Sequence, residues 1–246
     1  MDRKELESSL VLIKPDALKN SLTGYVLSQL SEFHTGLRFS ATKIVHVSRM
    51  LAEEHYAEHK GKAFFPSLIQ YITGRIHYPD QPWKRRVIAL VYQGSDAIKK
   101  VREIVGPTNP HVAREQRPGC IRALGTVVIL KDEAGKTIGD RLDNLIHASA
   151  TVPEAEREIK IWFRPNDIPP FMRAYDTEES DRHYYFKKGK LLTAHEKGSY
   201  CLLAPGDTVW QSDLAALRDL ARGKAAPCTI EAVAAKYLIN ETWEKD

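Results

Sequence analysis

Short apolar runs separated by helical patterns are the feature that most constrains the fold of this chain. Residues 9–14, 37–47 and 85–94 are rich in aliphatic and β-branched side chains and too short for ordinary buried helices, so each predicts a strand. The piece "LIHA" at 145–148 is long enough for a fourth strand. A capping box, Thr151 with Glu154, predicts that a helix follows it directly. An earlier amphipathic helix is expected in "SDAIKKVREIVG", with Ser95 as its cap and Gly106 just past its end.

The order strand, helix, strand, strand, helix, strand is typical of an α+β fold. It predicts a ferredoxin-like βαββαβ antiparallel sheet with helices on one face. A further hairpin is expected to turn at 132–135, before the fourth strand. Beyond residue 164 the chain becomes turn-rich, and then indicates one or two hairpins and two capped amphipathic helices. We therefore expect two domains, 1–164 and 165–246, the second a small mixed extension.

Composition excludes several classes of protein. No apolar run approaches the roughly eighteen residues of a membrane helix, and the N-terminus lacks the apolar stretch of a secretion signal. A formal net charge of +4 is too small an excess to predict duplex nucleic acid binding. Cys120, Cys201 and Cys228 form no C-x-x-C pair, so neither a zinc site nor a disulfide framework is indicated. We expect a soluble, cytoplasmic protein.

One histidine, His147 in "NLIHASAT", is a candidate nucleophile. A neutral imidazole can attack phosphorus if its second nitrogen is held by an acceptor and donors surround the phosphoryl oxygens. Glu158 is such an acceptor, because it lies between the buried positions Ala155 and Trp162 of the following helix. The start of that helix and Ser149 offer donors to an anion. The alternative is structural: a histidine after two aliphatic residues is usually a core residue, and a helical glutamate is usually solvated.

A family resemblance adds to this interpretation. "LVLIKPDAL", "EEHYAEHKGKAFFPSLIQYI", "VREIVGPTNP", "RPGCIRALG" and "NLIHASATVPEAEREIKIWF" occur in the order, and nearly at the spacing, of the nucleoside diphosphate kinases. The resemblance covers about residues 10–163, so the chain resembles such a kinase with an unfamiliar C-terminal extension. It implies ping-pong transfer of the γ-phosphate from an NTP to an NDP through a phosphohistidine.

The resemblance also implies a role for particular residues. His147 would carry the phosphate, Glu158 would orient it, and Tyr56 would lie beside it. Lys14 would contact the phosphates and the ribose 3′-hydroxyl, and Phe64 would stack on the base. The remaining implied nucleotide contacts are Arg102, Thr108 and Arg122 to the phosphates and Asn144 to the sugar. Without the resemblance, Lys14 would be an ordinary turn lysine, Arg102 a solvated helix residue and Phe64 a core residue. Mg²⁺ is expected to bind mainly through the nucleotide phosphates, with no protein metal site.

Several features depart from the family pattern. Ala148, Ala150 and Thr151 stand where most members have glycine, aspartate and serine. We expect activity to survive, because alanine at position 148 keeps its backbone N–H as a donor to phosphate. Only a positive φ at this residue would strain the alanine. Insertions at 74–86, 109–119 and 130–143 leave the base or sugar preference and the expected homo-oligomer open.

Two other classes of function stay possible. In the first, the chain is a catalytically weak or inactive nucleotide-binding regulatory or scaffold protein, whose extension binds a protein partner. In the second, the extension binds nucleic acid. This is the weakest of the hypotheses, because acidic residues in the extension balance the basic ones. The basic residues concerned are Lys187, Lys188, Lys190, Arg218 and Arg222.

Overall fold

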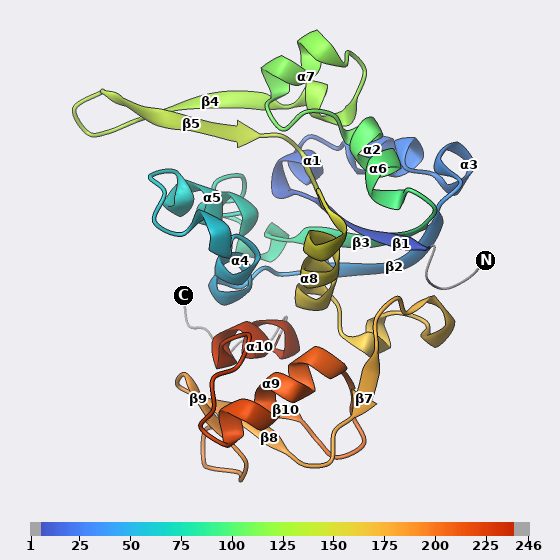
Figure 1. Ribbon diagram of the computed structural model, residues 1–246. Coiled ribbons are helices and arrows are strands. Elements are labelled where there is room, and N and C mark those ends of the chain that lie inside the picture. The colour runs from blue at the N-terminus through green and yellow to red at the C-terminus, as the bar shows by residue number, and fades with distance from the viewer. Residues whose placement is uncertain (1–5, 239–246) are drawn as a thin grey trace.

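The computed structural model describes residues 6–238. Its main sheet has four antiparallel strands in the order β2-β3-β1-β6. The strands span Glu7–Ile13 (β1), Arg38–Val45 (β2), Val87–Gly94 (β3) and Ile146–Ala148 (β6). The four predicted strands and the ferredoxin-like βαββαβ order are confirmed (Figure 1).

Strand β1 is central and buried on both faces. Leu10 and Leu12 contribute to one hydrophobic cluster, whereas Val11 and Ile13 contribute to another, as the two-residue period of a strand requires. Helices α1 (Pro15–Lys19), α2 (Thr23–Gln29) and α6 (Ala97–Val105) cover the Val11 face. The crossover helices thus lie on one face, as predicted.

The opposite face carries a second layer of helices, which the sequence pattern did not predict. It consists of α4 (Arg49–His55), α5 (Phe65–Ile72) and α8 (Val152–Trp162), whose apolar residues pack in the cluster that holds Leu10 and Leu12. The short helices α3 (Glu32–Thr35) and α7 (Pro110–Gln116) complete this part of the chain. Both faces of the sheet are therefore protected from water.

The starts of α8 and α6 are built differently. The Thr151 hydroxyl accepts from the Glu154 amide at 3.3 Å, and the Glu154 carboxylate accepts from the Ala150 amide at 3.2 Å, which completes the predicted capping of α8. For α6 the expected cap, Ser95, is wrong. The N-cap position is Asp96, in a left-handed conformation with φ 54°. A carboxylate oxygen of Glu7 accepts from the Ile98 amide at 3.3 Å, so β1 supplies the acceptor that Ser95 does not.

The predicted hairpin is formed by β4 (Thr126–Lys131) and β5 (Thr137–Asp143). It extends away from the main sheet past α5 (Figure 1). Its turn is closed by a hydrogen bond from the Lys136 amide to an Asp132 carboxylate oxygen at 2.8 Å. At its base, a Cβ on Gly125 would lie 2.6 Å from the Asp143 carbonyl oxygen, so only glycine permits this close approach.

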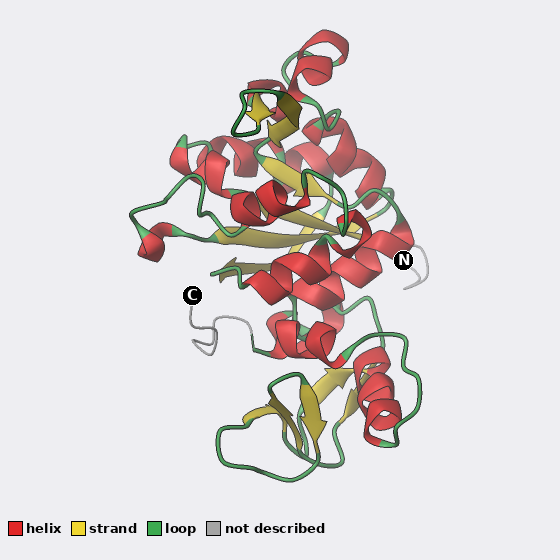
Figure 2. Cartoon of the chain, turned by 90° about the vertical axis from the view of Figure 1, so that its left-hand side faces the viewer, coloured by secondary structure: helices red, strands yellow, loops and turns green. Residues whose placement is uncertain are grey.

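The extension has its own small core. Strands β8 (Tyr184–Lys187), β9 (Lys190–Leu192) and β10 (Tyr200–Leu203) form one sheet, and β7 (Thr177–Glu179) pairs with β11 (Thr208–Trp210). Helices α9 (Gln211–Ala221) and α10 (Ile230–Tyr237) pack on these strands. The predicted hairpin and both helices are confirmed, and Figure 2 shows the extension as a separate lobe below the main sheet.

The extension nevertheless packs tightly on the first part of the chain. Helix α10 contacts α4 and α8. The Trp210 indole is fully buried and donates to the Phe163 carbonyl at 2.8 Å. Trp210 lies in the cluster that holds Leu10 and Leu12. The division into 1–164 and 165–246 therefore stays a prediction about domains, since a shared core joins the two segments.

Two further predictions concern the chain as a whole. Cys120, Cys201 and Cys228 are free thiols. Within residues 6–238, no helix has both the length and the apolar character needed to cross a lipid bilayer.

Candidate active site

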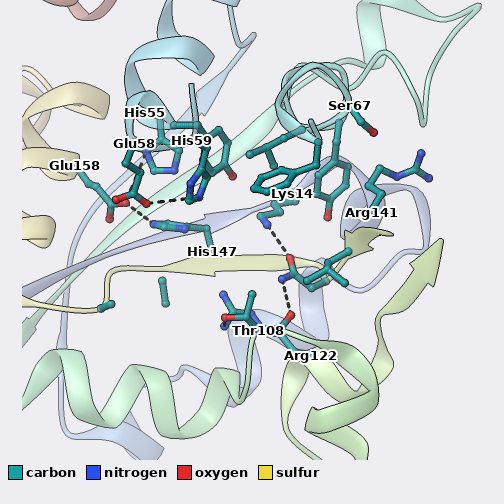
Figure 3. A pocket seen from close by; sticks show the side chains of 18 of the residues that line it. Lys14, His55, Glu58, His59, Ser67, Thr108, Arg122, Arg141, His147 and Glu158 are labelled. Carbon is teal, nitrogen blue, oxygen red and sulfur yellow. Dashed lines mark hydrogen bonds and ion pairs between the residues drawn. The ribbon is translucent and has the colours of Figure 1, made fainter. Parts of the chain in front are cut away.

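His147 lies on β6 directly opposite Leu12 of β1. Alternation along the strands turns its side chain toward the face that α4 and α8 cover. There the Nε2 atom of His147 lies 2.8 Å from Oε1 of Glu158, which is buried on α8 (Figure 3). The sequence-based prediction that this glutamate faces the histidine is met in the geometry. With Nε2 turned to the carboxylate, Nδ1 is the ring nitrogen left for a substrate.

A hydrogen-bond network fixes the Glu158 carboxylate. The Ser149 hydroxyl donates to its second oxygen at 2.6 Å and accepts from the Leu10 amide at 3.2 Å. His55 Nδ1 lies 3.8 Å from Oε1 of Glu158 and accepts from the Trp162 indole at 3.2 Å. The His55 and His147 rings meet edge to face, 4.7 Å apart. Glu158 on α8 is thus held by Ser149, which the main chain of β1 holds in turn.

A cavity of about 430 Å³ opens in front of His147. It brings together these residues proposed from the sequence: Lys14, Tyr56, Phe64, Arg102, Thr108, Arg122, Asn144, His147 and Glu158. Ser149 is not among the lining residues, because it is fully buried behind Glu158. The Ser149 hydroxyl donates to Glu158 instead of facing the cavity, so the expected contact between Ser149 and a bound phosphate is not formed by this arrangement.

The cationic side chains are held by backbone carbonyl groups and one amide. Both Nη atoms of Arg122 donate to carbonyl oxygens, of Gly106 at 3.0 Å and of Ile146 at 3.1 Å. Lys14 Nζ donates to Asn144 at 2.7 Å, and the Asn144 amide donates to the Thr108 carbonyl at 2.9 Å. These contacts fix positive groups around the cavity before any anion arrives, as preorganised stabilisation requires.

Burial and like charges set the protonation states. Burial, followed by Lys14 and Arg122, lowers the pKa of His147 well below its ordinary value, so the imidazole is neutral at pH 7. Burial and the nearby Arg122 lower the pKa of Lys14 to about 7. Burial and Arg102 lower the pKa of Arg122 to about 10. A bound polyphosphate would relieve this repulsion, which makes the cavity receptive to anions.

Sequence reasoning missed part of the lining. His55 and His59 are neighbours of Tyr56 in "EEHYAEH", but nothing in their spacing indicated which would face inward. The hairpin β4–β5 contributes Leu130, Arg141 and Leu142. Its insertion was visible in the sequence, whereas its position over the cavity depends on tertiary packing.

The two alanines beside Ser149 leave the backbone intact. Ala148 lies in β6, paired with Val11, and its φ is not positive, so the strain considered for it does not arise. Ala150 lines the cavity, and its amide donates to Glu154. The loss of a carboxylate at position 150 is thus compensated by the capping residue of α8.

Comparison with known proteins gives the family. The nucleoside diphosphate kinase family model matches residues 7–168. The chain belongs to the nucleoside diphosphate kinase family. It is 38% identical over 172 residues to a nucleoside diphosphate kinase of Pyrococcus furiosus, which covers 70% of this chain and 92% of that protein. It is 36% identical over 163 residues to one of Thermus thermophilus, covering 66% and 99%.

Solved structures of nucleoside diphosphate kinases share the fold. The kinase of Aquifex aeolicus superposes with a TM-score of 0.52 at 30% identity and covers 67% of this chain and 99% of its own. A Borrelia burgdorferi kinase with bound vanadate and ADP, described as a transition state mimic, gives 0.52 at 30% identity, covering 69% and 94%. Like its relatives, the chain is a phosphotransferase with nucleoside diphosphate kinase function, while the matched region ends at residue 168.

Proposed function

We propose that the chain transfers the γ-phosphate of an NTP to an NDP in two steps through Nδ1 of His147. In the first step Nδ1 attacks the γ-phosphorus, the bond to the β,γ-bridging oxygen breaks, and the NDP leaves. In the second step a new NDP oxygen takes the phosphoryl group from the histidine. The observation that carries the proposal is the 2.8 Å contact of Nε2 with Glu158, which leaves Nδ1 as the nucleophilic atom.

Glu158 has two tasks in this proposal. It holds the ring so that the Nδ1 lone pair faces the cavity, and its charge stabilises the ring as Nδ1 bonds to phosphorus and positive charge develops. Ser149 acts through Glu158, as a positioning residue. The low pKa of His147 keeps the free nucleophile unprotonated.

The cations would bind the phosphate chain. Arg102, Arg122 and Thr108 line the part of the cavity next to His147, and guanidinium groups offer planar forks to phosphate oxygens. Lys14 and Asn144, joined by their hydrogen bond, would contact the sugar. Tyr56 presents a buried hydroxyl without a hydrogen-bond partner among the described residues, which suits a contact with the transferred phosphate. Phe64, 39% exposed, would stack on the base.

Magnesium fits this donor set only as a companion of the nucleotide. Mg²⁺ prefers oxygen ligands, whereas the cluster of possible ligands among the described residues, His55, His147 and Glu158, supplies two nitrogens and one carboxylate. The ion would supply charge neutralisation on the phosphates when bound. We also propose a homo-oligomer in the cytoplasm and a protein partner for the extension. Sedimentation of the full chain would test the assembly, and affinity capture with the full chain would test the partner.

A labelling experiment tests the phosphohistidine. Full-length protein incubated with γ-labelled ATP should acquire acid-labile, base-stable phosphate, located by peptide mapping at His147. His147→Ala should lose both the label and NTP/NDP exchange while keeping its circular dichroism spectrum, and His34→Ala, an exposed histidine, should keep them. Saturable nucleotide binding with no label and no exchange in the wild type would instead favour the regulatory or scaffold role.

A further inference from the structure

Two of the three insertions of this chain meet beside the nucleotide cavity. One connects α5 to β3 and carries His77; the other is the β4–β5 hairpin, which ends at Asp143. His77 Nε2 lies 3.4 Å from an oxygen of Asp143. Asp143 precedes Asn144 directly and is 8% exposed. The insertions therefore form one wall, adjacent to the residue placed to contact the sugar.

That wall fixes the side chain of Arg141. Its Nε and Nη2 donate to the two oxygens of Asp143 at 2.6 and 3.1 Å, a two-point contact that sets the plane of the guanidinium. Within residues 6–238, Nη1 makes no hydrogen bond, although Arg141 lines the cavity. A guanidinium has five N–H donors, so the contact with Asp143 leaves donors on both Nη atoms for a ligand.

Arg141 lies at the end of the cavity where the base of the nucleotide is proposed to bind. Figure 3 shows Arg141 beside Ser67, on the side of Lys14 that faces away from His147 and Glu158. The apolar residues that would hold the faces of a base come from α5 and its N-cap, Phe64 and Leu68, and from the hairpin, Leu130 and Leu142. A base between these walls presents its edge, and not its face, to a side chain at the rim.

We propose that Arg141 recognises the O6 and N7 acceptors of guanine, so that this kinase favours guanine and hypoxanthine nucleotides over adenine nucleotides. The proposal rests on the phosphotransfer function proposed above. Arginine forks onto the O6 and N7 edge of guanine, whereas adenine presents an amino donor in place of O6. Asp140 also lines this wall, but a carboxylate cannot donate to either atom. Stacking alone would bind all bases alike; Arg141 adds a preference to it.

The test uses the isolated phosphoenzyme of the full chain. Purified protein is phosphorylated with ATP and freed of nucleotide. It is then mixed in a quenched-flow instrument with GDP, IDP, 7-deaza-GDP or ADP. We expect the second-order rate constants for GDP and IDP to exceed that for ADP roughly 10-fold, and 7-deaza-GDP to lose most of this advantage because it lacks N7.

Variants assign the preference to the side chain. The GDP to ADP ratio should fall toward one in Arg141→Ala and also in Arg141→Lys, because an ammonium group cannot fork onto two acceptors. Lys136→Ala, at the exposed hairpin turn, should keep the wild-type ratio. Equal rates for GDP, IDP and ADP in the wild type, or a preference that persists in both Arg141 variants, would overturn the assignment. Failure to form any phosphoenzyme would overturn the proposed function instead.

Discussion

The hydroxyl of Ser149 donates to the carboxylate of Glu158 at 2.6 Å, and both residues are shielded from solvent. The same hydroxyl accepts from a main-chain amide of β1. The serine therefore joins the central strand of the sheet to the residue that faces His147. Its effect on the reaction passes through Glu158, and this arrangement leads to the first two predictions.

Ser149→Ala should lower both stability and rate. The variant leaves the buried Leu10 amide without its hydroxyl acceptor and frees one oxygen of Glu158, which costs about 1–3 kcal/mol of unfolding free energy. Urea denaturation measures this, with Ser28→Ala, an exposed serine, as a control expected within about 0.5 kcal/mol of wild type. An unchanged unfolding free energy for Ser149→Ala would contradict the network.

Glu158→Gln keeps the shape of the side chain and removes its charge. We expect the rate of phosphorylation by ATP to fall roughly 10²-fold, because the ring loses the anion that stabilises it as Nδ1 bonds to phosphorus. Single-turnover quenched flow separates this step from product release. If Glu156→Gln, at a half-exposed glutamate of the same helix, lowered the rate equally, the role assigned to Glu158 would be wrong.

The dependence on pH should come from Lys14 more than from His147. Below about pH 7 Lys14 is protonated, and above it the charge is lost, so kcat/KM for ATP should decline as pH rises through 7. Neutral His147 should cause no decline until the pH falls well below 6.5. The profile is measured at constant ionic strength. Lys14→Gln should give a low kcat/KM that is flat around pH 7, and a remaining decline there would exclude Lys14 as its source.

Trp210→Ala should destabilise the whole described chain. A large, fully buried side chain would leave a cavity in the cluster that includes Leu10 and Leu12, at a cost of about 3–5 kcal/mol. Because the cluster joins the extension to the main sheet, denaturation should shift as one transition by circular dichroism and by retained activity. Phe171→Ala removes an aromatic ring that is 73% exposed and serves as the control. Two separate transitions, with activity lost only in the second, would show that the segments are independent.

Lys236→Met should be costly because it breaks a buried ion pair. Lys236 Nζ lies 2.6 Å from Asp213, and both side chains are at most 8% exposed, so the variant leaves an uncompensated carboxylate and costs about 3–5 kcal/mol. Lys187→Met breaks the exposed pair with Glu196 and should cost less than about 1 kcal/mol. Equal losses in thermal or urea denaturation would contradict the difference in burial.

Local sequence patterns predicted which helices and strands form. They predicted less well which distant residues contact each helix or strand. The buried strand β1 and the cap at Thr151 depend on neighbouring residues, so the sequence predicted them. The start of α6 depends on Glu7, which lies far away in the sequence, and the local expectation of Ser95 was wrong for that reason.

The same limit applies to the candidate site. His147, Glu158 and the cations could be proposed from motifs, and the structure places them around one cavity. The hydrogen bond from Ser149 to Glu158 and the position of Arg141 at the cavity could not be predicted. The first depends on which of two acceptors lies nearer in the fold, and the second depends on where the β4–β5 hairpin lies over the cavity.

The packing of α10 on α4 and α8 also affects the resistance of the active site to proteolysis. Helix α10 is joined to α9 by an exposed segment that includes Arg222 and Lys224, both targets for trypsin-like cleavage. A single cut there would leave α10, which packs on the helices that carry His55 and Glu158, held by noncovalent contacts alone. The working lifetime of the cavity would then be set by a surface segment that never contacts the nucleotide.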